Sequence, residues 1–148
     1  MKKINVVIVD DEPNAVSLLE SYFERYFSLE IKLLQSFTDS QKAFTFITHT
    51  ADIDLVVFDI NMPGMSGVEL LEAFPNRPFE AVFITAYSDY SLKAFKNKAL
   101  DYLLKPIDRM EFIHSMKTTI QRVLKLRASE STYSRFTVNH KGVNVFID

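Results

Sequence analysis

Five short runs rich in β-branched and other apolar residues recur along the chain, and longer stretches with helical periodicity separate them. A chain that alternates in this way favours βαβ units, whose strands lie parallel in one sheet. The expected strands are Ile4–Val9, Ile31–Ser36, Leu55–Asp59, Ala81–Thr85 and Leu100–Leu104. We therefore predict an α/β fold in which helices cover both faces of a buried parallel sheet.

Several residues mark where helices begin. Pro13 suits a first helical turn, because its missing N–H is not needed there. Three pairs have the spacing of reciprocal N-terminal caps: Thr38 with Gln41, Ser66 with Glu69, and Asp108 with Glu111. The last of five predicted helices runs from about Arg109 to Leu126 and carries an apolar stripe that should pack on the sheet.

Carboxylates follow two of the predicted strands. Asp10 and Asp11 come directly after the first strand, and Asp59 ends the third. If these strands are neighbours, the three side chains meet at the carboxyl edge of the sheet, where α/β folds place their sites. Three anions at one place repel one another unless a hard cation joins them. Capping of a loop or helix is the alternative role, and for Asp10 and Asp11 it is compatible with binding a cation.

Composition narrows the class of protein. With 148 residues, of which 47% are hydrophobic, the chain can bury one full core. It has no cysteine, which excludes disulfides, thiolate zinc sites and cysteine nucleophiles and fits a reducing compartment, so we expect a cytoplasmic protein. The apolar stretch after Met1 ends at Asp10, too early for a secretory signal, and no stretch approaches a membrane-spanning length.

Four landmarks now carry a family resemblance: Asp10-Asp11, Asp59 with Asn61-Met62-Pro63-Gly64 behind it, Thr85-Ala86, and Lys105-Pro106. In this order, at strand ends, they resemble the receiver domain of bacterial two-component response regulators over roughly residues 1–125. The resemblance implies a flavodoxin-like, doubly wound sheet of five parallel strands in the order 2-1-3-4-5. The amino-acid sequence of residues 85–95 and 99–106 resembles that of receivers joined to LytTR-type DNA-binding domains.

The resemblance also implies roles for the landmark residues. Asp59 would accept a phosphoryl group from a sensor histidine kinase in a reaction that requires Mg²⁺. Asp10, Asp11, Asp59 and the backbone carbonyl of Asn61 would hold that ion. Lys105 would counter charge on the transferring group, and its peptide bond to Pro106 would be cis.

Four positions would control switching and lifetime. Thr85 and Tyr102 would form the switch, in which Thr85 moves toward the new charge and Tyr102 turns inward, changing the surface near Tyr90–Phe95. The alternative is that Thr85 is only a β-former and Tyr102 only a half-buried aromatic residue. Asn61 and Tyr87 would border the path by which water attacks the acyl phosphate.

The end of the chain follows a different pattern. We predict a receiver over residues 1–125, a linker over 126–134, and the start of a truncated output domain over 135–148, with two strands around Lys141-Gly142. Residues 109–148 carry seven basic and three acidic side chains. The favoured function is transcription regulation, in which a phosphorylation-promoted dimer binds DNA through the output domain.

Two alternatives stay open. One is a stand-alone receiver that acts through protein–protein contacts. The other is a Mg²⁺-dependent aspartyl phosphatase, which is disfavoured because Asn61 stands where such enzymes carry a second acid. In the favoured interpretation the chain is not an enzyme toward other substrates and catalyses only its own phosphorylation and dephosphorylation.

Overall fold

The computed structural model describes residues 2–86 and 99–139. Five parallel strands form one sheet in the order β2-β1-β3-β4-β5, as the sequence predicts. The strands are β1 (Ile4–Val9), β2 (Ile31–Phe37), β3 (Leu55–Asp59), β4 (Glu80–Thr85) and β5 (Asp101–Leu104). The helices are α1 (Pro13–Phe27), α2 (Ser40–Thr48), α3 (Gly67–Glu72) and α4 (Arg109–Asn139).

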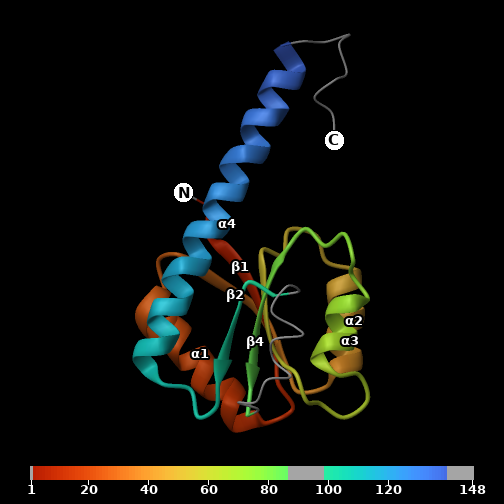
Figure 1. Cartoon of the computed structure of the whole chain (residues 1–148), viewed down its shortest axis with the longest axis vertical. Coiled ribbons are helices and arrows are strands. Elements are labelled where there is room, and N and C mark those ends of the chain that lie inside the picture. The colour runs from red at the N-terminus through yellow and green to blue at the C-terminus, as the bar shows by residue number, and fades with distance from the viewer. Residues whose placement is uncertain (1, 87–98, 140–148) are drawn as a thin grey trace.

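Helices cover both faces of the sheet, with α1 and α4 on one side and α2 and α3 on the other (Figure 1). The side chains of each strand alternate between these faces. In β1, Ile4, Val6 and Ile8 pack in the core under α1 and α4, whereas Val7 and Val9 pack in the core under α2 and α3. The central strands are therefore apolar on both faces, which explains their unbroken apolar runs.

The helix starts agree with the sequence in most places. Helix α1 begins at Pro13, and Ser66 with Glu69 forms the predicted capping box of α3. Asp108 Oδ2 accepts from the Glu111 amide at 3.0 Å. The prediction that Thr38 caps α2 is wrong. The cap is Asp39, whose carboxylate accepts from the Gln41 amide at 2.9 Å, because a side chain two residues before that amide reaches it in a tight turn.

The last helix is longer than predicted. The backbone stays helical through Asn139, so residues 126–134, predicted as a linker, are helical, and the prediction of a strand over 135–139 is wrong for these residues. No proline or glycine lies between Pro106 and Gly142, so nothing in this stretch breaks a helix that has already formed. The second predicted strand lies outside the described residues, and the division into receiver and output domain stays a prediction.

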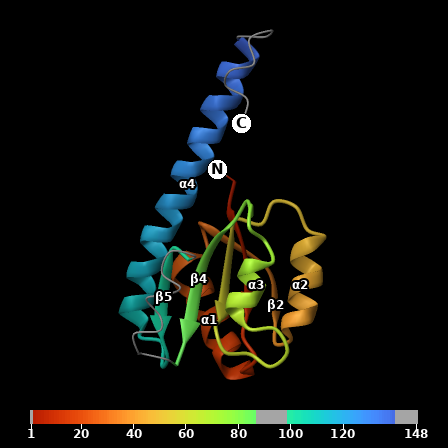
Figure 2. The same ribbon diagram turned by 45° about the vertical axis from the view of Figure 1, so that its right-hand side comes forward.

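Helix α4 extends well beyond the edge of the sheet (Figure 2). Within the described residues, neither this helix nor any other is long and apolar enough to cross a membrane. The segment near Tyr90–Phe95, between β4 and β5, whose surface the predicted switch would change, falls outside the described part of the chain.

Candidate functional site

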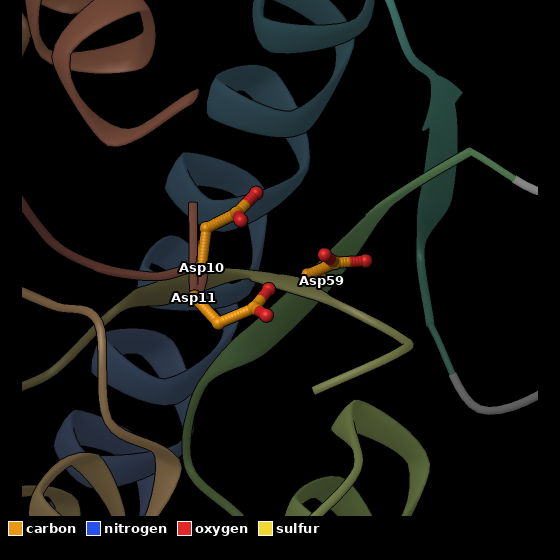
Figure 3. Close-up of side chains that lie close together, drawn as sticks. All are labelled: Asp10, Asp11 and Asp59. Carbon is orange, nitrogen blue, oxygen red and sulfur yellow. The ribbon is translucent and has the colours of Figure 1, made fainter. Parts of the chain in front are cut away.

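Three aspartates meet at the carboxyl edge of the sheet. Asp10 and Asp11 follow β1, and Asp59 ends the neighbouring strand β3 (Figure 3). One carboxylate oxygen from each lies within 4.8 Å of the others. The convergence predicted from the sequence is therefore present, because β1 and β3 pair directly and in parallel.

Two of these carboxylates are buried. Asp10 is 1% exposed and Asp59 is 5% exposed. Burial raises the pKa of Asp10, although hydrogen bonds from the Glu12 amide and from Lys105 oppose this. Burial also raises the pKa of Asp59, and the negative charge of Asp10 adds to the rise while Lys105 opposes it. The site therefore holds more negative charge than the Lys105 ammonium alone balances.

Lys105 supplies that cation from the segment after β5. Its Nζ donates to Asp10 Oδ1 at 3.2 Å, to Asp59 Oδ2 at 3.1 Å and to Glu12 Oε1. Burial lowers the pKa of Lys105, but these three carboxylates outweigh it and raise the pKa above its usual value. The peptide bond between Lys105 and Pro106 is cis, as the resemblance implies.

The donor set fits a hard divalent cation. It consists of carboxylate oxygens, which Mg²⁺ prefers, and two of the three carboxylates are buried. Asp10 Oδ2 is buried and accepts no well-aligned hydrogen bond from the described residues, and it lies 2.9 Å from Lys105 Nζ in an ion pair. A metal ion would give this buried oxygen a second positive partner and offset more of the cost of its burial.

The loop after β3 fixes the backbone around Asp59. The backbone N–H of Asn61 donates to Asp59 Oδ1 at 3.2 Å, and the backbone N–H of Gly67 donates to the Ile60 carbonyl at 2.8 Å. A Cβ on Gly67 would lie 2.2 Å from the Asp59 carbonyl oxygen, so only glycine fits there. Gly64 adopts a positive φ of 81° in the same loop. Both glycines therefore serve loop geometry.

The predicted switch residues lie on the two strands beyond β3. Thr85 is fully buried at the end of β4, and Tyr102 is half-buried on β5. Tyr102 pairs with Phe83 and packs in the core under α2 and α3. Since Thr85 follows Phe83 by two residues, strand alternation puts Thr85 and Tyr102 on the same face of the sheet. Tyr87, the predicted neighbour of the water path, lies outside the described residues.

Sequence reasoning missed Glu12. This residue is the N-cap of α1, and its side chain makes no cap hydrogen bond but contacts Lys105 instead. Its backbone amide donates to Asp10 Oδ1 at 2.9 Å. The only signal in the sequence is that Glu12 follows Asp10-Asp11 directly.

Residues 6–117 match the family described as "Response regulator receiver domain". The transcriptional regulatory protein BtsR of Escherichia coli (strain K12) is 33% identical over 129 residues, which cover 86% of this chain and 51% of BtsR. This chain spans about half or less of the length of the curated relatives it matches.

Solved structures agree with this match. The response regulatory domain of protein mrkE from Klebsiella pneumoniae superimposes with a TM-score of 0.72 at 29% identity, covering 82% of this chain and 99% of that domain. A chain of the CheX-CheY-BeF3-Mg²⁺ complex from Borrelia burgdorferi gives a TM-score of 0.68 at 28% identity, covering 78% of this chain and 87% of that one. By its sequence match, its sheet order and its strand-end residues, this chain belongs to the response regulator receiver domain family.

Proposed function

We propose that this chain is a phosphoacceptor switch in which Asp59 takes a phosphoryl group from a sensor histidine kinase in a Mg²⁺-dependent reaction. The observation that carries the proposal is the environment of Asp59. Its carboxylate is buried beside the Lys105 ammonium, with the carboxylates of Asp10 and Asp11 next to it. A capping aspartate does not need two further anions beside it.

The proposed step is a displacement at phosphorus. An oxygen of the Asp59 carboxylate forms a bond to phosphorus, and the bond from phosphorus to the donor breaks with its electron pair staying on the donor. Lys105 donates hydrogen bonds toward the transferring group and offsets its negative charge as a point charge. The Asn61 amide, which donates to Asp59 Oδ1, helps to orient the carboxylate.

Asp10, Asp11 and Asp59 would hold Mg²⁺, together with the backbone carbonyl of Asn61. When bound, Mg²⁺ neutralises charge on the carboxylates and on the phosphoryl oxygens. We propose that the chain acts on no other substrate, so that its chemistry is limited to its own phosphorylation and dephosphorylation.

The proposed switch uses Thr85 and Tyr102. Thr85 would hydrogen-bond a phosphoryl oxygen, and Tyr102 would turn inward in response. Their common sheet face and the partial exposure of Tyr102 support this coupling. Asn61 and Tyr87 would set the lifetime of the acyl phosphate.

For the whole protein we propose transcription regulation through a C-terminal DNA-binding domain, of the LytTR type, in a phosphorylation-promoted dimer. Two observations support an output domain. This chain spans 51% of BtsR, which is named a transcriptional regulatory protein. The amino-acid sequence around Thr85 and Lys105 also resembles that of receivers joined to LytTR-type domains. Sequencing the gene beyond the codon for Asp148 tests directly whether it encodes a DNA-binding domain there.

Intact-mass measurement tests the phosphoacceptor function. The chain, incubated with acetyl phosphate and Mg²⁺, should gain one phosphoryl group. Asp59→Asn should gain none, and excess chelator should prevent labelling of the wild type. The matched control is Asp52→Asn, which removes an exposed carboxylate that precedes β3, whereas Asp59 ends that strand, and it should label normally. Labelling of Asp59→Asn at the wild-type level contradicts the proposal.

A further inference from the structure

We infer that Glu12 limits the availability of Lys105 for phosphoryl transfer: its carboxylate holds the Lys105 ammonium in the resting protein and releases it when a phosphoryl donor reaches Asp59. The inference deepens the proposed function and rests on it.

Glu12 touches two members of the site at once. Its backbone amide donates to Asp10 Oδ1 at 2.9 Å, and its side-chain Oε1 accepts from Lys105 Nζ, 93 residues along the chain. As the N-cap of α1, its backbone is held by the helix start, with the Ala15 and Val16 amides donating to its carbonyl at 3.0 and 3.2 Å. The side chain is thus attached at a fixed point beside the site.

The hydrogen-bonding capacity of Lys105 makes this contact matter. An ammonium group has three N–H donors. In this structure Nζ contacts three carboxylates, those of Asp10, Asp59 and Glu12, so all three donors have partners. A phosphoryl donor that approaches Asp59 brings new acceptor oxygens while Asp59 is still a carboxylate, and Lys105 can donate to one of them only after it gives up a present partner.

Exposure decides which partner Lys105 gives up. The side chains of Asp10 and Asp59 are 1% and 7% exposed, whereas that of Glu12 is 62% exposed. A buried carboxylate that loses its cation stays desolvated, but an exposed one returns to water at little cost. Glu12 is therefore the exchangeable partner, and it competes with the incoming phosphoryl group for Lys105.

Replacing Glu12 by glutamine should make Lys105 available sooner. The apparent rate constant for phosphorylation by acetyl phosphate in saturating Mg²⁺ should rise about twofold to fivefold, the range expected when an exposed ion pair no longer has to break. Glu24→Gln on the same helix is the matched control, since it removes the same charge from an exposed position several turns away and should leave the rate unchanged.

A double-mutant cycle shows whether Glu12 acts through Lys105. The phosphorylation rate constant of Glu12→Gln is compared with that of the wild type, and the rate constant of the double variant is compared with that of Lys105→Ala. Thermal unfolding checks that all four proteins are folded. The increase should be present in the first comparison and absent in the second. An increase that persists without Lys105, an unchanged rate, or a slower rate in Glu12→Gln overturns the inference. If the wild type takes up no phosphoryl group at all, the proposed function itself fails.

Discussion

Arg127 Nη2 donates a hydrogen bond to Asp54 Oδ2 at 2.6 Å, and this ion pair joins α4 to the segment that leads into β3. The same guanidinium donates to the carbonyls of Lys2 and Lys3 at 3.1 Å, just before β1. Asp54 Oδ2 also accepts from the Asn5 amide at 2.8 Å. The helix is therefore fastened at the edge of the sheet opposite the aspartate cluster.

Arg127→Gln should lower the free energy of unfolding by about 1–3 kcal/mol, because it leaves a partly buried carboxylate without its cation. Arg122→Gln is the control. Arg122 is 54% exposed and lies 3.8 Å from Glu80, so its loss should change stability by no more than about 0.5 kcal/mol. Urea denaturation of the three proteins measures the difference, and equal losses in both variants contradict the structural role of Arg127.

Gly67→Ala should damage the site through the backbone. Its Cβ would lie 2.2 Å from the Asp59 carbonyl oxygen, so the loop or the end of β3 must shift. We expect a lower midpoint of thermal unfolding and slower phosphorylation by acetyl phosphate. In Gly64→Ala the nearest atom to the new Cβ is 3.7 Å away, so the strain of its positive φ should lower stability by about 1–2 kcal/mol but leave Asp59 in place. Normal labelling of a folded Gly67→Ala protein would show that the close approach does not matter.

The buried carboxylates predict an unusual dependence of stability on pH. The pKa of Asp10 and that of Asp59 are raised in the folded protein, mainly by burial, so the folded state binds these protons more tightly than the unfolded chain does. Without Mg²⁺, the contribution of these groups to the free energy of unfolding therefore falls as pH rises from about 4 through their raised pKa values. The penalty is fully present once the pH lies above both raised pKa values.

Asp59→Asn removes part of that penalty. In chelator at neutral pH its midpoint of thermal unfolding should be higher than that of the wild type, and the gain should shrink both at acidic pH and in Mg²⁺. Asp52→Asn controls for the loss of one negative charge, because Asp52 is exposed and asparagine also tolerates its φ of 65°. A destabilised Asp59→Asn protein in chelator would mean that its contact with Lys105 outweighs burial and repulsion.

The 148-residue chain should show no sequence-selective DNA binding at physiological salt. Its basic C-terminal part can attract phosphates weakly and in a salt-sensitive way, but selectivity needs base-edge contacts from a folded reader. A protein extended past Asp148 should bind its promoter sites, and more tightly when phosphorylated, because a dimer engages two half-sites together. Tight, selective binding by the present chain in a gel-shift assay would place the reader within these residues.

Local patterns in the sequence predicted the strands, and the family resemblance of the residues at the strand ends predicted the sheet order. The apolar runs of β1 and β3 predict buried parallel strands, and the aspartates at their ends predict a cluster, because parallel strands bring like ends together. The capping box of Ser66 and Glu69 could also be predicted from the sequence, since it needs only residues three positions apart. Strand ends differed from the predictions by at most one residue.

Two features were visible only in the tertiary structure: the full length of α4 and the contact between Glu12 and Lys105. Composition suggested a linker after Leu126, but the helix continues because nothing breaks it and Arg127 fastens it to the body of the domain. Glu12 and Lys105 are 93 residues apart, and neither residue type specifies the other as its partner. Their contact, which makes Glu12 part of the site, exists because the sheet places the ends of β1 and β5 at the same edge.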